Sequence, residues 1–192
     1  MFLHGCARPT IAVLYTDPKE QRHVKTYEVV LKDKDFVEGP SAQSNLDAGA
    51  SLIIPVPMPI GGMIVVGANN IVYLGAACTH TLAIPNPELF MAYGRVDADG
   101  SRFLLSDAHG MLHLLALGHD RDRVLKLKLE PLGRTSVARS ISYLDNGIVY
   151  VGSQSGDSQL IRLNTEPDMA NDGSFVEVSD YDDPTRLPHL CL

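Results

Sequence analysis

The sequence predicts an all-β protein, a partial β-propeller of about three to four WD40-like blades with four antiparallel strands each. The main observation is a hairpin of two short apolar strands that recurs along the chain. It is clearest at residues 148–163, looser at 103–116 and weakest at 64–74. The turn glycines Gly110 and Gly156 lie 46 residues apart, and a repeat of about 40–50 residues is typical of propeller blades.

The second observation is that helical periodicity is missing from the sequence. No segment of about ten or more residues keeps an apolar period of 3.6 residues. About eleven to thirteen strands can be placed. At four strands per blade, this number corresponds to about three to four blades. Most closed propellers contain more blades, so we expect this chain to be a fragment of a larger ring.

The N-terminal region is expected to begin with a hairpin and to continue as a loop. Residues 10–15 form a β-branched apolar run, and residues 23–31 alternate in the manner of a strand. Residues 32–48 are polar and contain Gly39 and Pro40. This composition predicts a surface loop.

Further strands are expected along the rest of the chain. Pro55 and Pro57 restrict a strand at 51–56 to a sheet edge or to its last residues. The Asp-Gly step at 99–100 favours a tight hairpin turn, whereas residues 76–93 are ambiguous. Short apolar or alternating runs predict the remaining strands, at residues 125–129, 136–143 and 175–178.

The domain organisation follows from where this pattern stops. Residues 1–178 are expected to form the partial propeller. Residues 179–192 are acidic, interrupted by proline and low in periodicity. We therefore expect a divergent, disordered tail at 179–192.

Composition and charge disfavour several classes of protein. The net charge of −7 should repel nucleic-acid phosphates. Three scattered cysteines, Cys6, Cys78 and Cys191, fit a reducing compartment better than a disulfide framework. No apolar run reaches the length of about 18–20 residues that spans a bilayer, and no signal peptide is recognisable. The expected locations are the nucleus and the cytoplasm.

Several long, collinear stretches between Phe2 and Asn164 carry a family resemblance. They lie at residues 2–6, 9–11, 23–28, 95–102 and 143–160, and include Tyr143-Leu-Asp-Asn-Gly147 and Gly156-Asp-Ser-Gln-Leu160. Together they resemble the family of the large subunit of the UV-damaged DNA-binding complex. Members of this family are adaptors of cullin-RING ubiquitin ligases. Propeller subunits of the cleavage/polyadenylation and splicing machineries share only the looser Gly-Ser-x-x-Gly hairpin.

The resemblance implies a protein–protein interaction scaffold that forms part of the first of three propellers. In that family the first and third propellers hold a helical segment of substrate receptors, and the second binds the cullin. The turn Gln154-Ser155-Gly156-Asp157 resembles a loop of the receptor-facing surface, so these four residues are the expected protein-binding site. The family usually has a large apolar residue where this chain has Ser155, which implies a weaker contact. The implied partners are substrate receptors of a cullin-RING ligase, with DNA reached only indirectly and with no membrane or small-molecule substrate.

Two other functions remain as alternatives. One is a nucleic-acid-binding subunit of the cleavage/polyadenylation or splicing type, against which the acidic balance argues. The other is a hydrolase, because Gly156-Asp157-Ser158 is similar to a Gly-Asp-Ser nucleophile. Such chemistry needs a histidine base with an orienting aspartate, but Asp183 and His189 lie six residues apart on the proline-containing tail. We favour a turn-stabilising role for this tripeptide and expect no enzyme activity.

Candidate ligand sites in the sequence are weak, and no metal or cofactor is expected. His109 and His113, considered with Cys78 and His80, do not share one face as they would on a helix. Residues 97–100 resemble a calcium loop but lack its glutamate ligand. Three arginines form either a phosphate-binding stripe or, as we favour, the solvated faces of blades: Arg134, Arg139 and Arg162.

Overall fold

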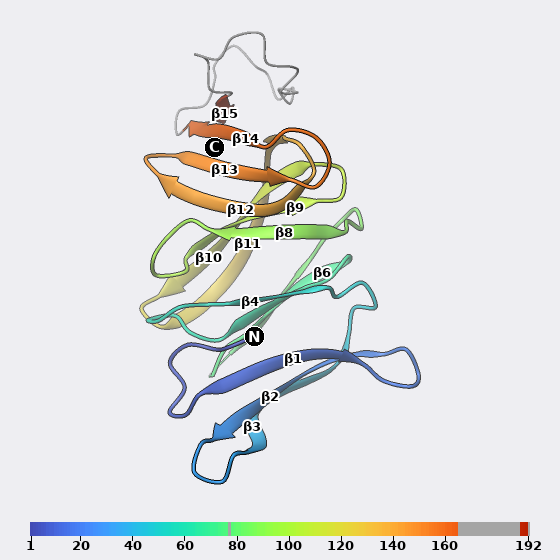
Figure 1. Ribbon diagram of the computed structural model, residues 1–192, viewed down its shortest axis with the longest axis vertical. Helices are drawn as coiled ribbons and strands as arrows, with labels where there is room; N and C mark the ends of the chain where they lie inside the picture. The colour runs from blue at the N-terminus through green and yellow to red at the C-terminus, as the bar shows by residue number, and fades with distance from the viewer. Residues whose placement is uncertain (77, 165–188, 192) are drawn as a thin grey trace. The chain divides into compact units, whose positions relative to one another are not determined.

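The computed structural model describes residues 1–76, 78–164 and 189–191, and every regular element within them is a β-strand. The strands form one sheet of three and three sheets of four (Figure 1). The first sheet, in the order β1-β2-β3, contains β1 (Thr10–Thr16), β2 (Arg22–Val30) and β3 (Asp35–Leu46). The second, β4-β5-β6-β7, contains β4 (Leu52–Pro55), β5 (Met63–Val66), β6 (Asn70–Leu74) and β7 (Thr79–Ala83). The third, β11-β10-β9-β8, contains β8 (Phe90–Arg95), β9 (Arg102–Asp107), β10 (Met111–Asp120) and β11 (Arg123–Arg134). The fourth, β12-β13-β14-β15, contains β12 (Ala138–Asp145), β13 (Ile148–Ser153), β14 (Gln159–Asn164) and β15 (His189–Cys191).

The repeated hairpin of the sequence forms the middle of each four-stranded sheet. The pairs β5–β6, β9–β10 and β13–β14 occupy the two central positions. This confirms the all-β prediction and the assignment of the hairpins to separate sheets. The last strand differs from the expected antiparallel pattern, because β15 runs parallel to β14. β15 falls within the tail predicted at 179–192; the other residues of that tail and the strand predicted at 175–178 lie outside the described part of the chain.

The chain divides into two compact units. Unit 1 comprises Met1–Phe90, Ala98–Ser101 and Leu117–Leu127, and unit 2 comprises Met91–Asp97, Arg102–Ala116 and Lys128–Leu192. The first two sheets belong to unit 1 and the fourth to unit 2, while the residues of the third sheet are divided between both.

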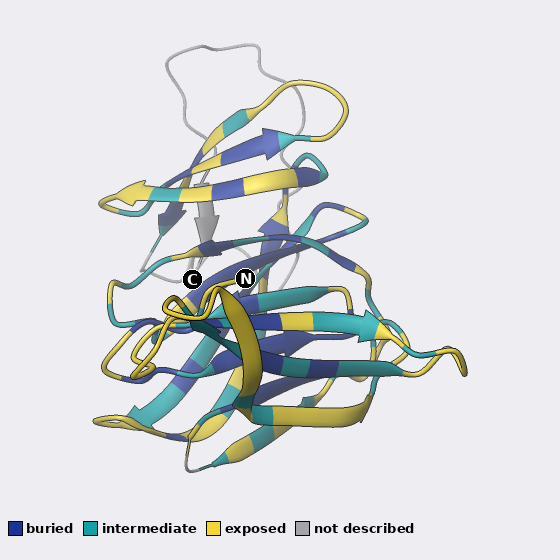
Figure 2. Ribbon diagram, turned by 60° about the horizontal axis from the view of Figure 1, so that its bottom comes forward, coloured by how far each residue is buried: buried dark blue, intermediate teal, exposed yellow. Residues whose placement is uncertain are grey.

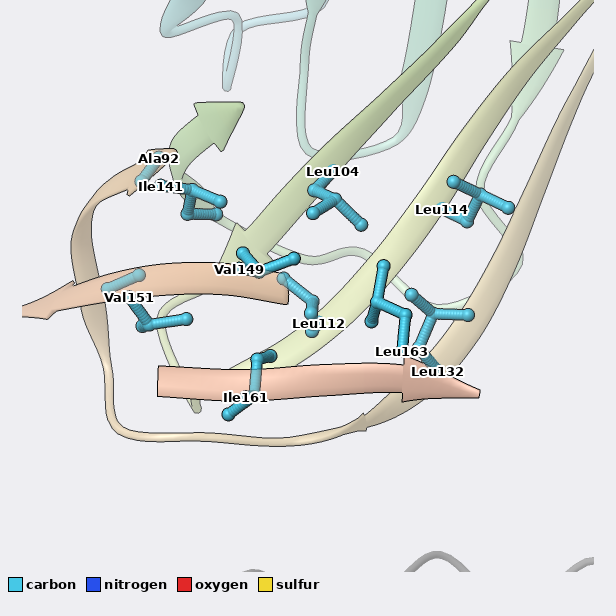
Figure 3. Close-up of a cluster of buried hydrophobic side chains, with 11 residues drawn as sticks. Ala92, Leu104, Leu112, Leu114, Leu132, Ile141, Val149, Val151, Ile161 and Leu163 are labelled. Atoms are coloured by element: carbon cyan, nitrogen blue, oxygen red, sulfur yellow. The ribbon is translucent and has the colours of Figure 1, made fainter. Parts of the chain in front are cut away.

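Each unit has its own apolar core. In unit 1, side chains of the first two sheets and of Ala50 are buried together: Ala12, Val24, Ala50, Met63, Val65, Val72 and Leu74. In unit 2, the third and fourth sheets contribute one cluster (Figure 3): Ala92, Leu104, Leu112, Leu114, Leu132, Ala138, Ile141, Val149, Val151, Ile161 and Leu163. Buried and exposed residues alternate along many strands (Figure 2), as expected for sheets that bury one face. Burial of these side chains removes apolar surface from water and is the main term that stabilises each unit.

The loop predicted at residues 32–48 is wrong, because residues 35–46 form β3. Nearly all of β3 is exposed, so no apolar pattern marks this strand in the sequence. Hydrogen-bonded pairing with β2 stabilises it in place of burial. The ladder is interrupted opposite Thr26, where β3 inserts Gly39, Pro40 and Ser41. The Thr26 hydroxyl donates to the Ser41 carbonyl at 2.8 Å and accepts from its N–H at 3.0 Å. Pro40 has no N–H to donate, and it is tolerated because it lies within this bulge of an edge strand.

The β1–β2 hairpin is closed by an aspartate that binds the turn and a histidine on the returning strand. Asp17 Oδ1 accepts hydrogen bonds from the N–H groups of Lys19 and Gln21, both at 2.8 Å. Asp17 Oδ2 lies 3.3 Å from Nε2 of His23, and the His23 ring stacks on Tyr15. The carboxylate therefore joins the turn to the first residues of β2.

The β9–β10 hairpin repeats this arrangement with the same spacing. Asp107 Oδ1 accepts from the N–H groups of His109 at 2.8 Å and Met111 at 2.9 Å. Asp107 Oδ2 lies 3.2 Å from His113 Nε2. The pattern Asp-x-x-x-x-x-His thus closes one hairpin in each unit, a spacing that was not predicted to be structural.

The two turns differ at one position, which leads to a stability prediction. Glu20 and Gly110 occupy the same place and both have positive φ, 63° and 79° respectively. An L-residue pays about 1 kcal/mol or more for this conformation, whereas glycine does not. We expect Glu20→Gly to raise the free energy of unfolding by about 0.5–1 kcal/mol, as measured by urea denaturation. Glu20→Ala serves as the control, and equal stability of the two variants would contradict this explanation.

Candidate protein-interaction site

The residues selected from the sequence form an exposed turn between β13 and β14. Gln154, Ser155, Gly156 and Asp157 are all exposed. Gly156 has a φ of 102°, and a Cβ added there would meet no atom within 4 Å. Glycine is therefore required by the backbone conformation and not by crowding.

Hydrogen bonds within the turn fix its conformation. The Ser153 hydroxyl donates to the Ser155 carbonyl at 3.0 Å, and the Ser153 N–H donates to the Ser158 hydroxyl at 3.3 Å. Ser158, the residue considered as a hydrolase nucleophile, thus binds the turn backbone. Asp183 and the His189 side chain lie outside the described residues.

The turn is also bound to the segment that connects β11 and β12. The Gln154 N–H donates to the Val137 carbonyl at 2.9 Å. The Ser136 hydroxyl donates to the Asp157 carbonyl at 3.2 Å, and the Ser136 N–H donates to Gln159 Oε1 at 2.9 Å. Asp157 thus supports the turn through its main chain, and its exposed carboxylate remains accessible to a partner.

The same connecting segment binds the β9–β10 turn. The Gly110 carbonyl accepts from the Thr135 N–H at 2.8 Å and from the Thr135 hydroxyl at 3.3 Å. Three loops of unit 2 are therefore joined into one surface, which we call the turn face: residues 108–110, 135–137 and 154–158. Because these hydrogen bonds order the turn face before any partner binds, less conformational entropy would be lost on association.

Asp107 lies beneath the turn face and is buried, with 2% of its surface exposed. Burial alone raises the pKa of its carboxyl group, but hydrogen bonds from His113, His109 and Met111 outweigh burial and hold the pKa below its ordinary value. A carboxylate with a lowered pKa in the folded state stabilises that state when it is ionised.

This electrostatic arrangement predicts a pH dependence of stability. The contribution of Asp107 is fully present above the pKa of the unfolded state, about 3.9, and is lost as the pH falls through the lower folded-state pKa. Asp107→Asn should cost about 1–2 kcal/mol at neutral pH and flatten the acid side of the stability profile. Urea denaturation across the acid range measures both effects. The exposed Asp145→Asn is the control, and an unchanged acid slope in Asp107→Asn would contradict the prediction.

The residues considered as metal ligands have other roles. His113 faces Asp107, while Cys78 Sγ and His80 Nε2 both contact the Val124 carbonyl, at 3.6 and 2.8 Å. Among the described residues, no group of three or more potential ligands is placed to hold a metal ion. Asp97, from the calcium-like segment, pairs with Arg102. Within the same part of the chain, no helix has the length and apolar character required to cross a bilayer.

Unit 1 contains a separate cavity of about 390 Å³. Its lining residues include Cys6, Cys78 and Tyr73. The Tyr73 hydroxyl donates to the Gly61 carbonyl at 2.9 Å, and burial raises its pKa to about 12. Tyr73 is therefore a neutral structural donor, not a base.

The four sheets and their central hairpins place this chain in the β-propeller class, as part of a propeller. The family model described as RSE1/DDB1/CPSF1 first beta-propeller matches residues 1–184. The chain belongs to this family.

Comparison with individual proteins gives close relatives in plants. The chain is 61% identical to DNA damage-binding protein 1 of Oryza sativa subsp. japonica over 177 residues. It is 58% identical to DNA damage-binding protein 1 of Solanum lycopersicum and to DNA damage-binding protein 1a of Arabidopsis thaliana, each over 177 residues. Each match covers 92% of this chain but 16% of the relative. The chain thus spans about one sixth of the length of these relatives.

The supporting residues of the turn face were not identified from the sequence. Thr135 and Ser136 bind turns that lie 25 and 21 residues away along the chain. A single hydroxyl residue in a polar connecting segment carries no local sign of such a partner. Only the recurring Asp-x-x-x-x-x-His spacing could have marked one of these turns.

Proposed function

We propose that this chain is part of a protein–protein interaction scaffold and that the turn face contacts substrate receptors of a cullin-RING ubiquitin ligase. Gln154, Ser155, Gly156 and Asp157 are the proposed contact residues. The observation that carries the proposal is that these residues form an exposed turn whose two ends are both bound to the segment that connects β11 and β12. An exposed loop on a rigid framework is a common means of protein recognition.

The chemistry of the turn favours a partner that is both polar and basic. Two carbonyls of the turn, those of Ser155 and Asp157, already accept hydrogen bonds. The exposed Gln154 side chain and the Asp157 carboxylate remain for a partner, and the chain carries a net charge of −7. A helical receptor segment with basic side chains would complement this surface.

Binding measurements with purified substrate receptors test this proposal. We expect Asp157→Arg to weaken the affinity about tenfold, equivalent to about 1.4 kcal/mol. Ser155→Leu should tighten it about fivefold, because a leucine there would bury apolar surface against the partner. Biolayer interferometry with the immobilised chain provides the dissociation constants.

The exposed Arg139→Gln, on β12 outside the turn face, is the matched control. If Asp157→Arg and Ser155→Leu both bind receptors like the unchanged chain, the turn is not the contact surface. The proposal treats DNA as an indirect partner, consistent with the acidic net charge. It also places the protein in the nucleus and the cytoplasm and assigns it no catalytic role.

A further inference from the structure

A second cavity, which belongs to unit 2, lies at the opposite end of β13 from the turn face. Its volume is about 300 Å³. Asn146 and Gly147, which line it, precede β13, whereas the turn at 154–158 follows that strand. The cavity is therefore distinct from the surface assigned to receptor binding.

The charged side chains that line this cavity are cationic. Arg102 and Arg162 both contribute to the wall, and no carboxylate does so among the described residues. Arg102 is held by Asp97, with Nη2 2.9 Å from Oδ1. Arg162 is exposed, and the described residues form no ion pair with it. In a chain of net charge −7, the cavity thus presents the guanidinium of Arg162 to an anionic ligand.

Neutral hydrogen-bond donors accompany the arginines. The Tyr143 hydroxyl oxygen accepts from the Gly147 N–H at 3.0 Å, which leaves its proton for another acceptor. Asn146, with a φ of 50°, adds a carboxamide at the cavity wall. A guanidinium, a phenol and an amide thus line one cavity.

Part of the remaining wall is apolar, and Asn164 adds a second carboxamide residue to the lining. Leu114 and Leu163 belong to the core cluster of unit 2 (Figure 3) and also line the cavity. Tyr143 packs against the same cluster. A ligand that fits would have an anionic group for the donors and an apolar body for this wall.

We propose that this cavity binds a phosphate monoester carried on a small apolar or aromatic body. A phosphate monoester has close to two negative charges at neutral pH and three terminal oxygens, which suits Arg162, Tyr143 and Asn146 together. Arginine is the residue that best matches phosphate geometry. This assigns to Arg162 a role different from that of Arg134 and Arg139, which do not line the cavity.

Titration of the isotope-labelled chain with phenyl phosphate, followed by NMR, tests the proposal. We expect saturable shifts at residues 143, 146, 147 and 162, and a higher dissociation constant at higher salt. Phenol, which lacks the charge, should not produce them. Arg162→Gln should weaken binding at least tenfold, while Arg139→Gln, which removes an exposed charge elsewhere on the same sheet, should leave it unchanged.

Tyr143→Phe provides a second variant, which keeps the ring and removes the hydroxyl proton. It should weaken binding several-fold, and its spectrum reports whether the fold is kept. Three outcomes would overturn the proposal: no saturable binding by the unchanged chain, shifts confined to other residues, or Arg162→Gln binding as tightly as Arg139→Gln. None of them bears on receptor binding at the turn face, so the two proposals fail separately.

Discussion

Replacement of Gly110 by alanine is expected to lower the free energy of unfolding of unit 2 by about 3 kcal/mol. Gly110 has a φ of 79°, and an added Cβ would lie 2.2 Å from the Thr135 carbonyl oxygen. The left-handed conformation alone costs an alanine about 1–2 kcal/mol. Relief of the clash would move Thr135 away and weaken its hydrogen bonds to the Gly110 carbonyl, each of which contributes about 1 kcal/mol.

Gly156→Ala is the matched control for this experiment. Gly156 also has a positive φ, but its added Cβ would meet no neighbouring atom. It should therefore cost only the conformational part, about 1 kcal/mol. Urea denaturation followed by circular dichroism measures both variants. Equal losses would show that contact with Thr135 contributes nothing and would contradict the description of the turn face as a connected surface.

Truncation of Leu112 to alanine is expected to cost about 3 kcal/mol. Leu112 is fully buried, with 0% of its surface exposed, in the core cluster between the third and fourth sheets. Removal of a buried leucine loses its transfer free energy and leaves a cavity, with a typical cost of about 2–5 kcal/mol. Thermal and urea unfolding of the variant give the loss.

Leu144→Ala provides the comparison for Leu112→Ala. Leu144 lies on β12 of the same unit but is 58% exposed. Its truncation should change the free energy of unfolding by less than about 0.5 kcal/mol. If Leu112→Ala were no more costly than Leu144→Ala, the two sheets would not share the core described here.

The fold was largely predictable because propeller blades repeat a strong local signal. The central hairpins combine β-branched strands with turn residues, and β5, β6 and β13 lie where the sequence predicts them. β3 was missed because pairing with β2, not burial, holds it in place. Hydrophobic periodicity detects strands that bury one face, and β3 is almost wholly exposed.

The exposed turn that carries the proposed contact residues was predictable from the sequence, but the contacts that hold it were not. Family resemblance drew attention to Gln154–Asp157, and the glycine at 156 indicated a turn. The carboxylate of Asp107, the hydroxyls of Thr135 and Ser136, and the pocket beside Arg162 depend on contacts between distant segments. Single-sequence reasoning has no access to such contacts, because residue type alone does not report which groups meet after folding.

The irregular course of β3 has a consequence for how copies of the chain meet one another. An outer strand with a continuous row of free N–H and C=O groups is a template for fibre growth. β3 breaks that row at Gly39 and Pro40, and again near Asn45, where the ladder shifts register and φ is 55°. The part of β3 before Gly39 carries the charged residues Asp35 and Glu38. We therefore expect β3 to be a poorer template for ordered aggregation than an edge strand with an uninterrupted row of free groups.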